Sequence, residues 1–323
     1  MKAAVVTEAG QSPVYDDFPS PAAQGGHHLV EVTASALSRV TRAKAAGAHY
    51  SSPDALPFVA GIDGTGRLED GRRVYFFGPQ APFGAMAQRS LVRAAHCIAL
   101  PDALDDVTAA AIAIPGMSSW AALTERARFV RGETVLVNGA TGASGRLAVQ
   151  IAKYLGAGKI IATGRNAAAL DMLGHLGADV AISLEQDEDS LSQAFAAHFR
   201  AGVDIVLDYL WGASARSLLL AAAKASAEAY PVRFVQIGSV GGADIELPGA
   251  VLRAAAITLT GSGIGSIALP RLLHAVKEVL DASMPAGLRI ATEAVPLAEL
   301  SRHWENVDSP VRTVFTLPSY APR

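Results

Sequence analysis

The sequence contains little that would indicate a secreted, membrane-bound or nucleic-acid-binding protein. Its single cysteine, Cys97, excludes an intramolecular disulfide framework and a zinc lobe built from cysteines. The 27 basic and 30 acidic residues nearly balance, and no basic stripe marks a nucleic-acid surface. No run approaches the roughly 18 apolar residues of a membrane span, and no signal-peptide core follows Met1. We therefore expect a cytoplasmic protein with neither nucleic acid nor membrane as a partner.

The composition is that of a large, well-buried α/β protein. Half of the 323 residues are hydrophobic and only 6% are aromatic, which is unlike a disordered or fibrous chain. A chain of this length is typical of about two domains.

The first hundred residues predict a β-rich domain, because short strands are broken by Gly and Pro. The expected strands are 2–8, 28–34, 61–68, 72–77 and 85–92. Residues 102–128 then predict two helices separated by Pro115-Gly116, which we interpret as the joint between domains.

Beyond residue 130, strands and helices alternate regularly, which predicts a doubly wound parallel sheet of six strands, the Rossmann arrangement. The last residues regain β character and are too few to form a core alone, so we expect them to rejoin the first domain. The predicted division is 1–115 with 280–323, and 116–279. The expected strands are 134–138, 159–163, 180–183, 203–208, 233–237 and 257–260, with helices near 146–156, 167–176, 190–199, 213–225, 248–254 and 270–282.

A glycine turn lies between the first strand and the first helix of this second domain. It has the spacing Ala140-x-Gly142-x-x-Gly145, with Ala in place of the usual first glycine. In this context, backbone amides and a helix N-terminus hold a dinucleotide pyrophosphate. Gly142 would let the phosphates approach the backbone, and Gly145 would let helix and strand pack. The predicted contacts are Ala140, Thr141, Gly142, Ala143, Ser144 and Gly145.

The end of the next strand predicts which dinucleotide binds. About 20 residues after the glycines, NAD sites place a carboxylate, but this chain has Gly164, Arg165 and Asn166. A guanidinium suits a 2′-phosphate, so NADPH is the expected cofactor. The alternative is a solvated surface arginine.

Further cofactor contacts are expected at other strand ends and helix starts. Ser118 begins a helix, where it could contact the nicotinamide or act as an ordinary N-cap. Small residues follow the fifth and sixth strands, where ligands of open sheets lie, although turn chemistry alone would also explain them. These residues are Gly238, Ser239, Gly261 and Ser262.

Together these features resemble the medium-chain dehydrogenase/reductase superfamily, in its zinc-free quinone oxidoreductase (zeta-crystallin-like) branch. The local signature includes Gly132-Glu133, Leu136, the glycine turn, Gln150 and Lys153, and the likeness extends over nearly the whole chain. The resemblance implies a GroES-like first domain and a cofactor between the domains. It also implies homodimers paired through the edge strand at 257–260. Leu184 stands where the family has a tyrosine that helps to hold the 2′-phosphate.

The residues that differ from zinc-dependent relatives predict a metal-free site. Those relatives use a Cys near position 38 and a Gly-His-Glu segment, whereas this chain has Ser38 and Gly61-Ile62-Asp63. Without a Lewis acid, hydride transfer favours an acceptor that spreads charge by conjugation, such as a quinone or enone. The substrate-side candidates are Ser38, His49 and Tyr50, with water or Tyr50 supplying the proton.

Other metal-free enzymes fit less well. No tyrosine is followed by lysine at the Tyr-x-x-x-Lys spacing of short-chain dehydrogenases, and the Gly238-Ser239 turn lacks the leading glycine of a nucleophile elbow. The sequence therefore predicts an NADPH-dependent, zinc-independent quinone or enone reductase. Two alternatives remain open. One is a reductase specific for C=C bonds, and the other is a non-catalytic NADPH-binding sensor, because the family's polar residues are absent at Ser38, Thr41 and Ala43.

Overall fold

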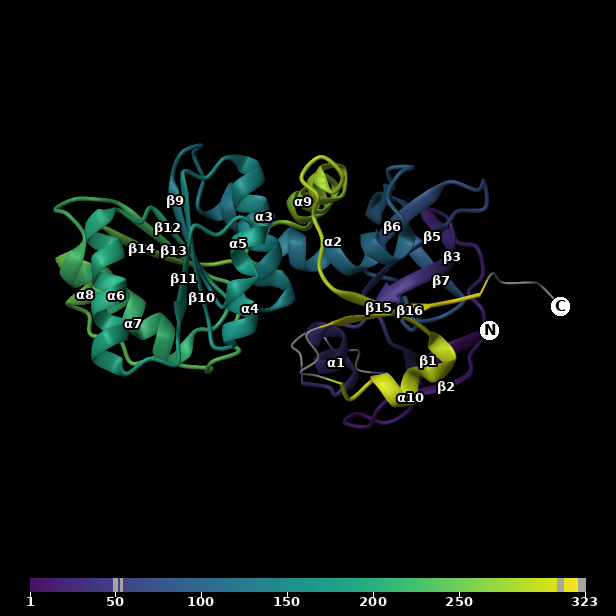
Figure 1. Cartoon of the computed structure of the whole chain (residues 1–323). Helices are drawn as coiled ribbons and strands as arrows, with labels where there is room; N and C mark the ends of the chain where they lie inside the picture. The colour runs from purple at the N-terminus through teal and green to yellow at the C-terminus, as the bar shows by residue number, and fades with distance from the viewer. Residues whose placement is uncertain (49–51, 53–54, 307–310, 319–323) are drawn as a thin grey trace. The chain divides into compact units, whose positions relative to one another are not determined.

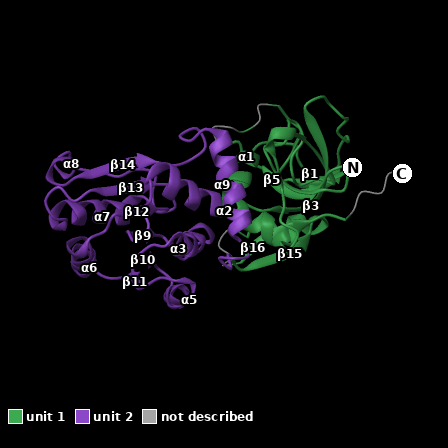
Figure 2. Cartoon of the chain, turned by 90° about the horizontal axis from the view of Figure 1, so that it is seen from above, with its two compact units in different colours: residues 1–114, 289–323 green, residues 115–288 purple. Residues whose placement is uncertain are grey.

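The computed structural model describes residues 1–48, 52, 55–306 and 311–318. The chain divides into two compact units (Figure 2). Unit 1 comprises Met1–Ile114 and Arg289–Arg323, and unit 2 comprises Pro115–Leu288. Residues 280–288, which the sequence placed with the first domain, belong to unit 2 because they continue from the long helix α9, and Leu288 is buried.

Unit 1 is built from two sheets of mostly antiparallel strands (Figure 1). A three-stranded sheet has the order β2-β1-β4, and a larger sheet has the order β15-β16-β3-β5-β6-β8, with β7 also paired to β3. Only β15 and β16 run parallel among the pairs described in this unit. The strands are β1 (Lys2–Val6), β2 (Val14–Asp17), β3 (His27–Ala36), β4 (Phe58–Val59), β5 (Asp63–Arg67), β6 (Arg73–Phe77), β7 (Arg89–Arg93), β8 (Cys97–Ala99), β15 (Thr292–Pro296) and β16 (Arg312–Thr316).

The short helices of unit 1 are α1 (Arg39–Ala45) and α10 (Leu300–His303), with 3-10 turns at Ala94–His96 and Leu297–Glu299. A core of alternating strand residues, such as Val30, Val32 and Phe315, is fully buried. This alternation explains why the sequence predicted the long strands correctly. It gave no signal for α1 or for the short strands β2, β4 and β8.

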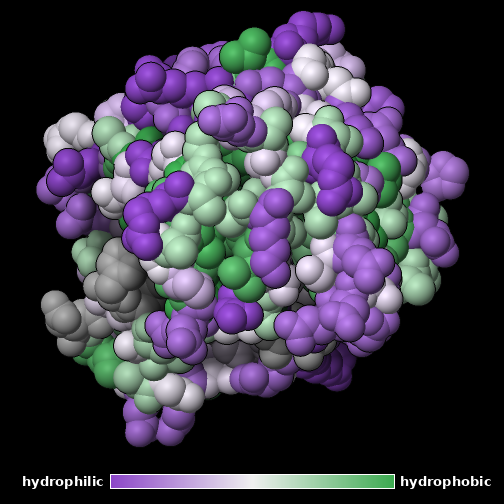
Figure 3. Space-filling view, turned by 90° about the vertical axis from the view of Figure 1, so that its left-hand side faces the viewer, coloured by the Kyte–Doolittle hydropathy of each residue, from purple (hydrophilic) through white to green (hydrophobic). Residues whose placement is uncertain are grey.

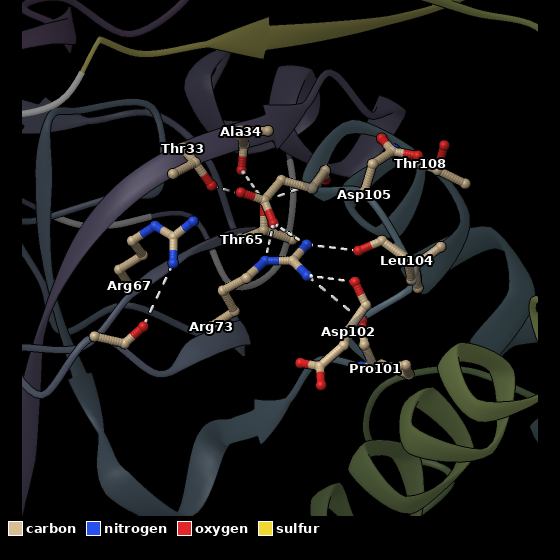
Figure 4. A network of polar contacts seen from close by, with 12 residues as sticks. Thr33, Ala34, Thr65, Arg67, Arg73, Pro101, Asp102, Leu104, Asp105 and Thr108 are labelled. Atoms are coloured by element: carbon tan, nitrogen blue, oxygen red, sulfur yellow. Dashed lines mark hydrogen bonds and ion pairs between the residues drawn. The ribbon is translucent and has the colours of Figure 1, made fainter.

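Arg73 on strand β6 forms hydrogen bonds with the start of helix α2 (Asp106–Ala121) and with the residues just before it (Figure 4). Its Nε donates to Asp106 Oδ1 at 3.1 Å, its Nη2 donates to the same oxygen at 2.6 Å and to the Leu104 carbonyl, and its Nη1 donates to the Asp102 carbonyl at 3.3 Å. A planar guanidinium can satisfy several acceptors in this way without leaving a donor idle.

Unit 2 contains one six-stranded sheet in the order β11-β10-β9-β12-β13-β14, with every pair parallel. This order confirms the predicted doubly wound fold class. The strands are β9 (Thr134–Asn138), β10 (Lys159–Gly164), β11 (Val180–Ser183), β12 (Ile205–Asp208), β13 (Val232–Gln236) and β14 (Ile257–Gly261). The helices are α3 (Ala143–Leu155), α4 (Ala167–Asp171), α5 (Leu173–Leu176), α6 (Glu188–Ala201), α7 (Gly212–Ala225), α8 (Val251–Ala254) and α9 (Leu269–Ala282).

The central strands of this sheet are covered on both faces, as Figure 1 shows by the helices on either side. Leu136, Val137 and Leu207 are all fully buried, so consecutive residues of β9 and β12 face apolar surroundings. The edge strand β14 differs, because Leu259 and its neighbours remain partly exposed.

The predicted break at Pro115-Gly116 is wrong, because α2 continues through Pro115 and is followed by a π-helical turn at Ala122–Arg126. Proline lacks the N–H of a regular helical bond. The hydroxyls of Ser118 and Ser119 donate to the Pro115 carbonyl at 2.8 and 3.1 Å. Gly116 is needed there because a Cβ would lie 2.6 Å from Val279 of α9.

The stretch Asp106–Arg126 is long and apolar enough to span a membrane by length and composition alone. In the structure, 72% of its most apolar window is buried inside the protein, which is also typical of a core helix.

Candidate functional site

The glycine turn of unit 2 presents backbone donors that have no partner within the described chain. Gly142 is the N-cap of α3, with no side-chain cap. The first hydrogen bond across this turn is from Arg146 N to the Gly142 carbonyl at 2.9 Å, and no acceptor in the described residues faces the N–H groups of residues 141–145. Unpaired N–H groups at the start of a long helix attract anions. A dinucleotide pyrophosphate therefore fits this turn.

The glycines of the turn have different surroundings. A Cβ on Gly145 would lie 2.3 Å from the Gly139 carbonyl oxygen and 2.6 Å from Ala140 Cα, so only glycine lets α3 pack on the end of β9. A Cβ on Gly142 would meet nothing within 4 Å, which leaves room for a ligand against the backbone. Gly139 has φ 87°, a left-handed conformation suited to glycine.

A buried network of polar side chains fixes the floor of the turn. Thr163 Oγ1 donates to Asn138 Oδ1 at 2.6 Å and accepts from Gly139 N at 3.1 Å. Asn138 Nδ2 donates to Asp208 Oδ1 at 2.8 Å and to Ser214 Oγ at 3.0 Å. The ends of β9, β10 and β12 are thus held together directly below the first residues of the turn.

Asp208 ends strand β12 and is fully buried. Besides Asn138, its carboxylate accepts from Leu210 N at 3.0 Å and from Trp211 N at 3.1 Å. Burial raises the pKa of this carboxyl above its usual range, and the hydrogen bonds from Asn138, Leu210 and Trp211 oppose the shift. Trp211 itself has φ 58°, a strained conformation for a non-glycine residue.

The next residue, Tyr209, joins the sheet to α2 and α3. Its buried hydroxyl lies 2.8 Å from Ser119 Oγ, and Ser119 Oγ lies 3.2 Å from the Ser144 carbonyl in the first turn of α3. Burial raises the pKa of Tyr209 to about 12, so the hydroxyl stays protonated. The predicted contact Ser118 lies one residue from this link, inside α2 and not at the helix start that the sequence predicted, with its hydroxyl directed to the Pro115 carbonyl.

The end of β10 places the predicted specificity residues beside the turn. Gly164 packs so closely that a Cβ would lie 2.4 Å from Thr141 Cγ2. Arg165 follows and is exposed, and no described residue forms an ion pair with its guanidinium. Asn166 caps α4 by accepting from Ala169 N at 2.9 Å. Leu184 packs against the apolar core and offers no polar side chain here.

The remaining cofactor candidates lie at the same edge of the sheet, because all six strands are parallel. Gly238 follows β13, and its N–H donates to the Asp208 carbonyl at 3.1 Å. Ser262 follows β14, and its N–H donates to the Gln236 carbonyl at 2.8 Å. Ser239 and Gly261 are exposed beside them. The structure thus brings the predicted residues that follow these strands to one edge.

On unit 1, Ser38 is buried and caps helix α1. Its Oγ accepts from Thr41 N at 3.0 Å and lies 2.9 Å from Thr41 Oγ1. The other two substrate-side candidates, His49 and Tyr50, lie outside the described residues. The role of all three as substrate contacts stays a prediction.

The positions where zinc-dependent relatives hold metal carry a different donor set. Asp63 is fully buried and accepts from the Tyr75 hydroxyl at 3.1 Å, while its Oδ1 has no partner. Burial raises the pKa of Asp63 to about 7, against the opposing charge of Arg312. Within the described part of the chain, no three His, Cys, Asp or Glu side chains gather as metal ligands.

The sequence did not single out Asn138, Thr163, Asp208 or the Ser119–Tyr209 pair. The signal was present, since Asn138, Thr163 and Asp208 are polar residues at the ends of buried strands, where open α/β sheets bind ligands. Trp211, which follows Asp208 and Tyr209, is partly buried against the apolar core of unit 2.

Comparison with known proteins finds a dehydrogenase family model and a quinone reductase that are similar to this chain. The zinc-binding dehydrogenase family model matches residues 143–282. The chain is 31% identical to the probable NADPH-dependent quinone reductase tdiC of Emericella nidulans, over 98% of this chain and 100% of that protein.

Solved structures match over the whole described fold. The quinone oxidoreductase of Thermus thermophilus, solved with and without NADPH, is 25% identical with a TM-score of 0.82, covering 98% of this chain and 100% of that one. A probable oxidoreductase from Mycobacterium abscessus is 27% identical with a TM-score of 0.78, covering 98% of each chain. The chain therefore belongs to the medium-chain dehydrogenase/reductase superfamily, in its quinone oxidoreductase branch.

Proposed function

We propose that this protein is a zinc-independent reductase that uses NADPH to reduce a quinone or another conjugated carbonyl compound. The observation that carries the proposal is the carboxyl edge of the unit 2 sheet. Unpartnered N–H groups at residues 141–145 and the exposed Arg165 occur there together, with no acidic residue at the end of β10. Two anionic groups, a pyrophosphate and a 2′-phosphate, suit these two features.

Each part of the edge has a distinct task in the proposal. The amides of residues 141–145 bind the pyrophosphate, and Arg165 binds the 2′-phosphate without help from Leu184. The Asn138–Thr163–Asp208 network keeps the turn in its binding conformation. Ser118 lies beside the Ser119–Tyr209 link, where it would orient the nicotinamide. When bound, NADPH supplies a hydride from C4 of that ring.

The relatives support the reaction, and the donor set of unit 1 supports independence from zinc. The Emericella relative is named as an NADPH-dependent quinone reductase. Ser38 caps a helix, and Asp63 accepts a hydrogen bond from the Tyr75 hydroxyl, which supports structural roles for both residues. A conjugated acceptor suits such a site because its developing charge is delocalised. Ser38, His49 and Tyr50 remain the proposed substrate contacts, and water or Tyr50 the proton source.

The proposal also includes a cytoplasmic homodimer joined through β14. This strand lies at the end of the sheet and pairs only with β13 among the described strands, so its outer edge carries unpaired backbone groups. Leu259 on β14 and Ile264 just after it are exposed. Figure 3 shows apolar surface bordered by hydrophilic side chains on the face of unit 2 that it turns to the viewer. Light scattering during gel filtration would give the mass of the assembly.

The test of function is stopped-flow oxidation of NADPH with a panel of small quinones and enones, before and after treatment with a zinc chelator. We expect quinone turnover that the chelator does not change. Turnover of enones alone would assign the C=C-specific reductase, and tight NADPH binding without any turnover would assign the sensor. Loss of turnover on chelation, restored by zinc, would contradict independence from the metal.

A further inference from the structure

Asp208 is a buried carboxyl group in unit 2 whose three N–H donors favour its ionised form. The residue is fully buried, and its hydrogen bonds come from the Asn138 amide and from the backbone N–H groups of Leu210 and Trp211. These donors are neutral, and no lysine or arginine among the described residues pairs with it. A buried charge that is only hydrogen-bonded acts on its surroundings over several ångströms, because the low-dielectric interior screens it weakly.

The position of Asp208 in the strand order indicates which half of a bound dinucleotide lies nearer to it. In a doubly wound sheet, the two nucleotides lie over the two halves of the strand order, on either side of the first βα turn. Arg165, at the end of β10, assigns the 2′-phosphate and hence the adenosine to the half formed by β9, β10 and β11. The nicotinamide then belongs to the half that begins with β12, and Asp208 is the last residue of β12.

We propose that the Asp208 carboxylate stabilises the oxidised, positively charged nicotinamide relative to the reduced, neutral ring. The inference rests on the proposed function. In that reaction the C4–H bond breaks, its electron pair leaves with the hydride to form a new bond in the acceptor, and the acceptor also takes a proton from water or a side chain. The ring gains one positive charge in this step. A fixed negative charge nearby favours that change.

The ratio of the dissociation constants of NADP⁺ and NADPH separates an electrostatic effect on the nicotinamide ring from a structural effect of the mutation. Pyrophosphate and 2′-phosphate carry the same charge in NADP⁺ and NADPH, so loosening the turn, or removing repulsion from the phosphates, changes both constants alike. Only the ring differs in charge. At a separation of about 10 Å and an effective dielectric constant near 20, removal of one charge shifts the ratio by about fifteenfold.

Strand β12 also offers a matched control. Asp204, just before β12, is likewise bound by neutral donors, Thr134 N at 2.7 Å and the Tyr230 hydroxyl at 2.6 Å. Four residues of extended chain separate it from Asp208, roughly 13 Å. Asp204→Asn therefore makes the same chemical change at the opposite end of the strand.

The experiment is a fluorescence or calorimetric titration of the full chain with NADP⁺ and with NADPH. In Asp208→Asn, and in Asp208→Ser if the first variant does not fold, we expect Kd for NADP⁺ divided by Kd for NADPH to rise about fifteenfold. Asp204→Asn should leave the ratio unchanged. A ratio that neither Asp208 variant changes, even if both affinities fall, would overturn the inference. Failure of the unmodified protein to bind either dinucleotide would instead overturn the proposed function, and the inference with it.

Discussion

The two ends of the unit 2 sheet carry similar polar residues but use them differently. At the amino end, the Glu133 carboxylate pairs with Arg233, whose Nη1 donates to the Ala127 carbonyl at 2.8 Å. Asp204 accepts from Thr134 N and from the Tyr230 hydroxyl, and among these groups only Arg233 Nε is buried without a partner. At the carboxyl end, the amides of residues 141–145 and the Arg165 guanidinium have no partner in the described chain.

This difference separates residues that stabilise the unit from residues that bind. Where the partners are in the chain, removing one leaves the other partly buried and unsatisfied, and the cost falls on folding. Where the partner is a ligand, the cost falls on affinity. Each end of the sheet therefore makes a different prediction for mutation.

We expect the largest effect at Gly145, where a mutation should lower both the stability of unit 2 and its affinity for NADPH. Gly145→Val should destabilise unit 2 by about 4 kcal/mol and abolish NADPH binding, because the side chain would force α3 away from Gly139 and Ala140. Thermal unfolding with and without NADPH measures both. The matched variant is Gly142→Ala, which has open space around its Cβ. It should unfold at the wild-type temperature while binding NADPH more weakly, and equal destabilisation by the two variants would contradict the different roles of the glycines.

In unit 1, the buried carboxyl of Asp63 has one oxygen without a hydrogen-bond partner. The pKa of Asp63 is raised to about 7, above its unfolded value, so the folded state holds a proton that the unfolded state releases. The stabilisation that this bound proton gives to the folded state is complete at low pH and is lost as pH rises through about 7. We expect stability to fall by roughly 2–3 kcal/mol between pH 5 and pH 8. Denaturant unfolding of Asp63→Asn at a series of pH values should show a smaller fall in the free energy of unfolding with pH. A fall equal to that of the wild-type protein would refute this assignment.

At the amino end, Glu133→Gln should lower stability by about 2 kcal/mol, because it leaves the partly buried Arg233 guanidinium without its counter-charge. The affinity for NADPH should stay within about twofold of the wild-type value, since this end has no ligand. Paired unfolding and titration experiments check both parts. A large loss of NADPH affinity in a folded Glu133→Gln variant would remove the distinction between the two ends.

The sequence predicted most of unit 2 because its signals are local. The β-branched run at 134–138, the glycines that follow it and Arg165 lie within about 30 residues of one another, so each can be recognised from its neighbours in the chain. The doubly wound order followed from the alternation of strands and helices. Of the substrate-side candidates Ser38, His49 and Tyr50, only Ser38 is described by the structure.

Features that depend on distant partners were missed. Asn138 and Asp208 are 70 residues apart, and Ser119 meets Tyr209 across 90 residues, so no local pattern revealed either pair. The continuity of α2 was missed for another reason. Proline predicts a break because it lacks the N–H of a regular helical bond, yet α2 continues through Pro115.

The carboxyl end as an NADPH site is tested most directly by titrating Arg165→Ala with NADPH and with NADH. The matched control is Arg200→Ala, which removes an exposed arginine from the last turn of α6. We predict that Arg165→Ala weakens NADPH binding about tenfold or more and leaves NADH binding nearly unchanged, while Arg200→Ala changes neither. Equal losses for NADPH and NADH, or no loss for either, would contradict the account.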